Sequence, residues 1–322
     1  MNLQELTTKI KNGYLINEAE ALEAVQTPDA QALYRAANEI RQHFCGNEFD
    51  TCSIINAKSG RCTEDCKWCA QSHKHHTGID EYDWVEPQRA INMGVGNGKR
   101  GVKRFCLVTS GRKLNDSQID NAVAILKEIG KQSDINLCSS MGLLSKAQLQ
   151  RLKDAGIGHY HCNIETAPSF FPKLCTSHTI EEKLQTITWA KEIGLQVCSG
   201  GIIGMGETMA QRVEMAIFLQ KIGVHSIPIN ILMPIKGTAL ENQKPLTSEE
   251  IFRTMAMFRL ANPTSLIRMA GGRILYKNEQ EQALHCGVNA SIVGDMLTTT
   301  GTHSIEEDLC DFRAAGFDVA CK

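Results

Sequence analysis

Three cysteines stand close together in the segment Cys62-Thr-Glu-Asp-Cys66-Lys-Trp-Cys69, at spacings of four and three residues. Thiolates are soft ligands that accept zinc or iron–sulfur clusters. A structural zinc site normally takes four protein ligands, often as two separated pairs, and this segment offers three in one run. A cubane cluster held by three thiolates keeps one iron open for a small molecule. The spacing therefore favours a [4Fe–4S] cluster with an open iron over zinc.

Three further cysteines lie in apolar segments that read as strands: Cys106, Cys138 and Cys198. Any one of them alone would more often be a small buried filler than a ligand. On separate strands of one barrel, however, inward-pointing side chains at similar height meet near the barrel axis. Such a ring of thiols could hold a second cluster.

Composition restricts the class of protein. The chain has 322 residues, thirteen cysteines and a formal net charge of −2. The polar, acidic N-terminal segment lacks the apolar stretch of a secretory signal, and no run reaches the ~18 apolar residues of a membrane span. We expect a cytoplasmic protein whose cysteines serve metal binding or catalysis instead of disulfides, with neither nucleic acid nor membrane as partner.

Two further patterns, a basic cluster and a histidine tract, are interpreted as solvated loops and not as binding sites. The basic cluster 99–104 is interpreted as a solvated loop before a strand, because short charge runs usually face solvent. The tract His73-Lys74-His75-His76 has no acidic partner in its neighbourhood and is likewise interpreted as a solvated loop.

The elements that must position these residues follow a repeating pattern. Helical stretches are predicted at 145–155, 180–193, 209–222 and 248–260, and Gly130, Gly156, Gly194 and Gly223 are each predicted to be the left-handed residue that ends a helix. Apolar strand candidates alternate with the helices, at 52–55, 104–108, 135–138, 159–164, 196–199, 226–232, 265–269 and 290–293.

Eight strands alternating with helices predict an α/β fold, a (β/α)8 TIM-type barrel with short N- and C-terminal additions. An open doubly wound sheet is the alternative. We expect one domain over residues 1–322, with a helical extension over about residues 1–50, because no linker or low-complexity segment interrupts the chain.

The cysteine motif after the first strand resembles the signature of radical S-adenosylmethionine enzymes. Within that superfamily the chain resembles the biotin synthase family over nearly its whole length. The matching stretches are CSIINAKSGRCTEDCKWC from Cys52, RFC from Arg104, VCSGGIIGMGE from Val197, IPINIL from Ile227 and IRMAGGR from Ile267.

The resemblance implies a set of ligands. Cys62, Cys66 and Cys69 would hold the [4Fe–4S] cluster, whose open iron binds S-adenosylmethionine. Cys106, Cys138, Cys198 and Arg268 would hold an auxiliary [2Fe–2S] cluster, although an arginine, with a pKa above ~12, is a poor metal ligand on general grounds. Asn163, Glu165, Lys183, Asn230 and Trp68 would surround substrate and S-adenosylmethionine, and the glycine-rich segment 200–206 would let backbone approach the latter.

Three residues depart from better-known relatives. Cys162 stands where they often have histidine, and Lys183 replaces an arginine expected to face the carboxylate of S-adenosylmethionine. Cys175 replaces an apolar residue, and its loop is expected to reach the auxiliary site. If Cys175 were a ligand there, a four-iron auxiliary cluster would be as reasonable as the two-iron form; the alternative is a buried filler.

The implied activity is insertion of sulfur into dethiobiotin to form biotin. An adenosyl radical would abstract hydrogen, and the auxiliary cluster, with Cys198 among its ligands, would donate sulfur. The resemblance also implies a homodimer and an electron donor such as flavodoxin or ferredoxin. Two alternatives stay open: another radical enzyme of similar barrel, of the hydrogenase-maturation or pyrrolysine-pathway type, and an iron–sulfur carrier without catalysis.

Overall fold

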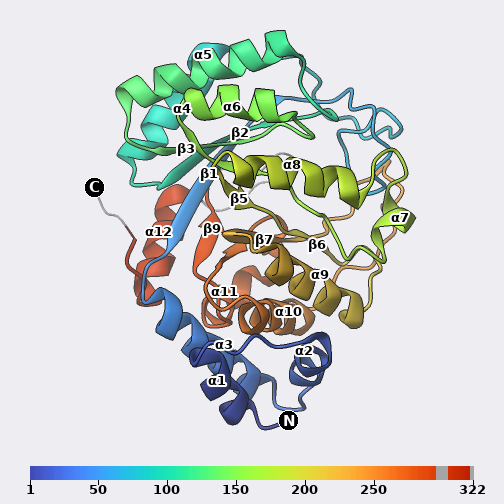
Figure 1. Ribbon diagram of the computed structural model, residues 1–322, viewed down its shortest axis with the longest axis vertical. Coiled ribbons are helices and arrows are strands. Elements are labelled where there is room, and N and C mark those ends of the chain that lie inside the picture. Colours follow the sequence, from blue (N-terminus) through green and yellow to red (C-terminus); the bar gives the residue numbers. More distant parts are fainter. Residues whose placement is uncertain (295–303, 320–322) are drawn as a thin grey trace.

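A closed parallel sheet forms the centre of the molecule in the computed structural model, which describes residues 1–294 and 304–319 (Figure 1). The strands pair in the order β5-β4-β3-β2-β1-β9-β8-β7-β6, and a further pairing of β5 with β7 closes the ring. The strands are β1 Asp50–Lys58, β2 Arg104–Thr109, β3 Asn136–Ser140, β4 Ile157–His161, β5 Gln196–Cys198, β6 Gly201–Ile203, β7 Ser226–Ile231, β8 Leu266–Met269 and β9 Ala290–Ile292.

The fifth position of the barrel is an interrupted strand. β5 pairs with β4, β6 pairs with β7, and the chain bends between them at Ser199 and Gly200. A Cβ on Gly200 would lie 2.0 Å from the carbonyl oxygen of Pro228, and one on Gly201 would lie 2.4 Å from that of Glu165. These glycines are therefore needed for close packing of the barrel backbone. Counting β5 and β6 as one position, the predicted eight-stranded (β/α) barrel is confirmed.

Helices cover the outside of the sheet, as Figure 1 shows. Those between barrel strands are α4 Pro87–Lys99, α5 Asp116–Gln132, α6 Lys146–Asp154, α8 Ile180–Glu192, α9 Met209–Ile222 and α10 Ser248–Ala261. All but α4 begin with a capping box, in which the side chain before the helix and the third helical residue satisfy each other's backbone N–H groups. Short elements complete the described chain: α7 Phe171–Leu174, η1 Arg273–Glu279, α11 Gln280–Leu284 and α12 Ile305–Ala314.

The predicted glycine stops are right at three of four positions. Gly156, Gly194 and Gly223 have φ of 103°, 79° and 61°, in the left-handed region that glycine tolerates. The prediction for Gly130 is wrong. It lies inside α5, which continues to Gln132 and ends where Ser133 becomes extended, so no left-handed residue is needed there.

Three helices precede the barrel at one end of the molecule: α1 Leu3–Lys11, α2 Glu18–Val25 and α3 Ala30–Cys45 (Figure 1). They pack against the barrel helices α9 and α10, where Tyr34 meets the edge of Phe252 with ring centroids 6.3 Å apart. This contact involves the outer helices and not the carboxyl-terminal edges of the strands, where a site is expected in a barrel. Among the described helices none is both long and apolar enough to cross a membrane.

Candidate active site

The loop after β1 brings the first three cysteines together. The Cys62 N–H donates to Gln71 O at 3.0 Å and the His73 N–H to Cys62 O at 2.9 Å, so the two ends of the loop are tied side by side. The Cys69 N–H donates to Cys66 O at 3.0 Å, which forms a tight turn between the last two cysteines. All three side chains line one cavity of about 320 Å³.

Burial makes these thiols poor acids. It raises the pKa of Cys62, and it raises the pKa of Cys69 to about 12. At neutral pH such thiols stay protonated unless a cation stabilises the thiolate, and a metal centre supplies that charge. Three converging buried thiols therefore fit a metal cluster that binds with release of protons.

The histidines that follow serve the loop backbone. His73 Nδ1 lies 2.7 Å from Cys62 O, and His75 Nδ1 lies 2.9 Å from Cys69 O. His73 and His76 are exposed. These contacts hold the carbonyl groups of two cysteine residues and agree with the interpretation of this tract as a loop.

The barrel interior brings the strand cysteines together. Cys106 and Cys138 are direct partners in the β2–β3 register, and both are buried. Cys198, at the end of β5, lines the same cavity of about 220 Å³, as does Arg268 from β8. The four residues predicted to surround an auxiliary cluster thus line one cavity inside the barrel.

Arg268 is held by neighbouring oxygen atoms. Its guanidinium contacts the Asp50 carboxylate, and Nη1 donates to Ser291 O at 3.0 Å and Asp50 O at 3.2 Å. Nε donates to Ser226 Oγ at 3.4 Å. Burial raises the pKa of the Asp50 carboxyl, but Arg268 and Arg104 outweigh it, so that this pKa lies below its ordinary value. The pair is ionised at neutral pH.

Sequence reasoning missed four residues of this interior: Asp50, Cys52, Arg104 and His161. Arg104 was placed at the end of a solvated basic loop, which is wrong for this residue. It is buried in the barrel, and its Nε donates to Asp50 at 2.8 Å. The signal that could have found Arg104 and Cys52 is strand alternation, because they lie two residues before Cys106 and Ile54, which point inward.

His161 is the fourth of the missed residues and stands beside Cys198 in the β4–β5 register. Burial raises the pKa of the Cys198 thiol, but His161 and Arg268 lower it more, to about 7. This cysteine is therefore the most readily ionised of those in the barrel interior that carry a shifted pKa.

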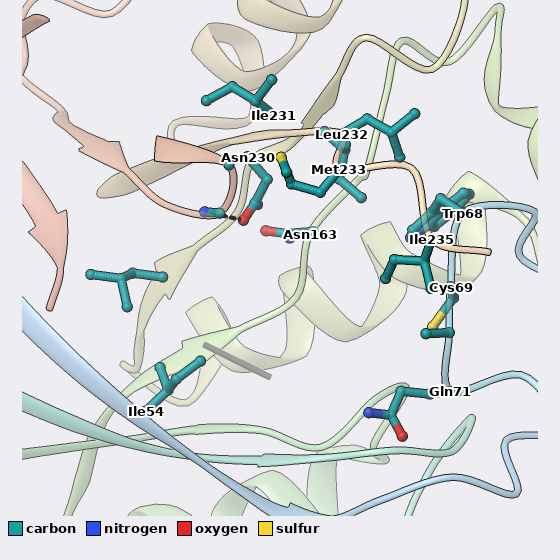
Figure 2. Close-up of a pocket in the computed structure, with 15 residues that line it drawn as sticks. Ile54, Trp68, Cys69, Gln71, Asn163, Asn230, Ile231, Leu232, Met233 and Ile235 are labelled. Carbon is teal, nitrogen blue, oxygen red and sulfur yellow. Dashed lines mark hydrogen bonds between the residues drawn. The ribbon is translucent and has the colours of Figure 1, made fainter. Parts of the chain in front are cut away.

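Polar side chains stand between the two cysteine groups. Asn163 follows β4 and lines the loop cavity, the barrel cavity and a third cavity of about 260 Å³, which Asn230 and Trp68 also line. Figure 2 shows Asn163 and Asn230 extending into this third cavity, with Trp68 and Cys69 on another side. Asn163 Oδ1 accepts from Gly200 N at 3.1 Å and Asn230 Oδ1 from Gly271 N at 2.9 Å, so the loop backbone holds both amides.

Glu165, which is half-buried, and the buried Lys183 form a pair in the loop cavity. Lys183 Nζ lies 3.9 Å from Glu165 Oε1, and Asn163 Nδ2 donates to Glu165 Oε2 at 3.4 Å. Glu165 has φ of 72°, unusual for a residue with a side chain, and such strain often marks functional positions. Burial raises the pKa of Glu165. Burial lowers the pKa of Lys183, but Glu165 and the neighbouring thiols together raise it above its ordinary value. The predicted cofactor-binding residues are thus brought to the loop cysteines.

Cys175 is not brought to the barrel interior. It follows α7, and its Sγ lies 3.6 Å from Cys66 Sγ and 3.3 Å from His178 Nδ1. It does not line the barrel cavity. The hydrogen bond from Cys66 and contacts with His178 and Ser177 lower its pKa to about 4. The residue therefore belongs to the surroundings of the loop cysteines.

Cys162 lies next to Cys198 along the backbone, where its N–H donates to Cys198 O at 3.0 Å, but it does not line the barrel cavity. It is buried, packs in the main apolar core and lines the loop cavity, and burial raises the pKa of its thiol.

Comparisons with known proteins identify the family. The radical SAM superfamily matches residues 57–219, and the Biotin and Thiamin Synthesis associated domain matches residues 228–318. A biotin synthase of Parabacteroides distasonis is 50% identical over 99% of this chain and 98% of its own length. One of Clostridium botulinum (strain Langeland) is 48% identical over 99% of each chain. This chain belongs to the biotin synthase family.

Solved structures support the fold. Methylornithine synthase is 17% identical, with a TM-score of 0.82 over 98% of this chain and 97% of its own. The [FeFe]-hydrogenase maturase HydG is 18% identical, with a TM-score of 0.81 over 98% of this chain and 74% of its own. At this identity they show that the barrel of this biotin synthase family member is shared, and nothing about its reaction.

Proposed function

We propose that this chain converts dethiobiotin to biotin by inserting sulfur between two carbons that carry unactivated C–H bonds. One observation supports this most directly: Asn163 lines all three cavities, so the cavity of the loop cysteines and the cavity of the barrel cysteines adjoin each other. A substrate bound where these cavities adjoin would contact residues around both the loop cysteines and the barrel cysteines. A simpler radical enzyme would need only the loop cysteines.

The loop side of the site is assigned to S-adenosylmethionine. Cys62, Cys66 and Cys69 would hold a [4Fe–4S] cluster through thiolates. Lys183 would offer its ammonium to the carboxylate of S-adenosylmethionine, as a point charge in place of a bidentate fork. Glu165 would accept a hydrogen bond from a ribose hydroxyl, and Asn230 and Trp68 would bound the space toward the substrate.

The barrel side is assigned to sulfur donation. Cys106, Cys138 and Cys198, with Arg268 beside them, would surround an auxiliary cluster of the two-iron or four-iron type. When bound, the two clusters and S-adenosylmethionine supply the radical and the sulfur that protein side chains lack. The chain itself positions the substrate and excludes water, because the barrel cavity is lined by buried strands.

Anaerobic reconstitution with iron and sulfide, followed by an assay for biotin and 5′-deoxyadenosine, tests the proposal. We expect both products from dethiobiotin and S-adenosylmethionine under dithionite. Neither product would indicate an iron–sulfur carrier without catalysis. 5′-Deoxyadenosine without biotin would indicate a different radical enzyme, of the hydrogenase-maturation or pyrrolysine-pathway type.

We further propose one domain, since β8 and β9 of the second matched region complete the barrel begun by the first. A homodimer and an electron donor such as flavodoxin or ferredoxin are proposed from the family alone. A cytoplasmic location is proposed because thiolate-held clusters require a reducing compartment, and all described cysteines are free.

A further inference from the structure

Cys52 is a fourth thiol in the barrel interior. It lies on β1, two residues before Ile54, which is the register partner of Cys106 on β2. Its side chain lines the same cavity as Cys106, Cys138, Cys198 and Arg268. Neither the sequence pattern nor the comparisons give it a role.

The surroundings of Cys52 differ from those of a cysteine that fills a core. Cys52, Cys106 and Cys138 pack against one another in a small cluster of their own, with only Ile54 and Val108 added. Cys286, by contrast, is buried within the main apolar core. Three thiols packed together at the wall of a cavity that a fourth thiol also lines match the four-thiolate ligand set of an iron–sulfur cluster.

Arg268 is poorly placed to be a metal ligand. All three nitrogen atoms of its guanidinium donate hydrogen bonds, to Asp50, Ser291 and Ser226. A protonated guanidinium has no lone pair to offer a metal, and Asp50 stabilises the protonated form. Ligation through Arg268 would require it to give up these hydrogen bonds and the Asp50 ion pair, whereas the Cys52 thiol makes a weak contact with Ser53 O, at 3.6 Å.

We propose that Cys52 is the fourth protein ligand of the auxiliary cluster, which completes a four-thiolate set with Cys106, Cys138 and Cys198. This rests on the proposed function, because it assumes that a cluster occupies the barrel cavity. Arg268 is then a positioning residue that places positive charge beside the thiolates while Asp50 holds it. Four thiolates suit either a two-iron or a four-iron cluster.

The test uses the full chain carrying Cys62→Ala, Cys66→Ala and Cys69→Ala, so that only the barrel site can hold a cluster. This parent chain, the same chain with Cys52→Ser and the same chain with Cys286→Ser are reconstituted anaerobically with isotopically enriched iron and sulfide. Mössbauer spectra then compare the iron sites. We expect Cys52→Ser to change the signal of one iron, since an oxygen replaces a sulfur, or to lower the iron bound. Cys286→Ser should match the parent.

A second measurement guards against a folding defect in Cys52→Ser. The parent chain, grown with isotope-labelled arginine, is reduced and examined by pulsed electron paramagnetic resonance. We expect no coupling from a directly bound arginine nitrogen. Such a coupling, or a Cys52→Ser spectrum that superimposes on the parent, would overturn the assignment. A parent chain that binds no iron would instead refute the auxiliary cluster, and with it the proposed function.

Discussion

The two cysteine groups are built in opposite ways. Cys62, Cys66 and Cys69 come from one short loop, and hydrogen bonds within this loop bring them together. The interior cysteines come from β1, β2, β3 and β5 and meet only when the barrel closes. The loop group is placed by local hydrogen bonds, whereas the interior group is placed by strand register. This contrast suits a site that must admit S-adenosylmethionine and one that must hold its atoms in place.

The largest expected effect is the loss of both products when the loop group is broken. Cys66→Ala should reduce 5′-deoxyadenosine formation under dithionite by at least about three orders of magnitude, because a catalytic unit fails when one member is removed. Biotin should be lost with it. The exposed Cys310→Ala is the control and should retain parent activity. Parent-rate cleavage in Cys66→Ala would show that the ligand assignment is wrong.

Breaking the interior group should separate the two products. Cys198→Ala removes the interior cysteine whose pKa is lowered to about 7, but leaves the loop cavity intact. We expect biotin to fall to background while part of the S-adenosylmethionine cleavage survives. Both products are measured by liquid chromatography in the same reaction, with Cys286→Ala as the buried control. Normal biotin yield in Cys198→Ala would refute the division of roles between the groups.

The interior group also depends on a buried charge network. Asp50→Asn leaves Arg268 and Arg104 without their carboxylate partner. We expect the free energy of unfolding at neutral pH to fall by about 3 kcal/mol, as for other broken buried pairs. Asp83→Asn is the control, because the Asp83 side chain is 80% exposed and its ion pair with Arg61 contributes little. Chemical denaturation measures the free energy of unfolding of both variants. Equal losses in Asp50→Asn and Asp83→Asn would show that the buried charge network does not stabilise the fold.

The loss of stability caused by Asp50→Asn should depend on pH in a definite direction. The pKa of Asp50 is lower in the folded protein than in the unfolded chain. Its contribution to stability is therefore fully present above the unfolded value of about 4 and is lost as the pH falls through the folded pKa. The difference in the free energy of unfolding between the parent and Asp50→Asn should be constant near neutral pH. It should shrink as the solution becomes acidic. A difference that widened in acid would contradict this assignment.

A smaller effect is expected from the cofactor-facing lysine. Lys183→Met removes the ammonium that pairs with Glu165 and, in our proposal, faces the carboxylate of S-adenosylmethionine. We expect KM for S-adenosylmethionine to rise about tenfold, the loss of one charge-assisted hydrogen bond, with a smaller change in kcat. Lys183→Arg should restore most of the affinity. A rise in KM for dethiobiotin alone would place Lys183 on the substrate side instead.

The contrast between the groups also explains what the sequence could predict. The loop cysteines are separated by a few residues, so their spacing alone indicates a shared ligand. The interior cysteines needed a fold, and the strand pattern predicted the barrel that brings Cys106, Cys138 and Cys198 together. Cys52 was missed because a lone cysteine in an apolar strand resembles a filler, and only register places it at the same cavity.

Two further errors have physical causes of the same kind. Arg104 was interpreted as solvated because a run of basic residues usually is, yet strand β2 begins at this residue and turns its side chain inward. The path of the loop after α7 could not be derived from the sequence. It carries Cys175 to the loop cysteines and not to the barrel cavity. Loops obey no period, so their side chains are placed by tertiary contacts alone.

The smallest expected effect tests that placement of Cys175. Cys175 Sγ lies 3.6 Å from Cys66 Sγ and 3.3 Å from an Asp65 oxygen, and His178 beside it is 2.6 Å from the Glu64 carboxylate. Cys175→Ser keeps a hydrogen-bonding group at this position. We expect S-adenosylmethionine cleavage to change by no more than about threefold, because serine keeps a hydrogen-bonding oxygen here and Cys175 is not one of the proposed cluster ligands.

The auxiliary cluster in the barrel cavity should be unaffected by Cys175→Ser. In chains that lack Cys62, Cys66 and Cys69, the Mössbauer spectrum with Cys175→Ser should superimpose on that of the parent, whereas Cys52→Ser should alter it. The reverse result would place Cys175 among the interior ligands and Cys52 among the fillers. It would also require the loop after α7 to move away from Cys66 when the barrel site is filled, because Cys175 contacts Cys66 and does not line the barrel cavity.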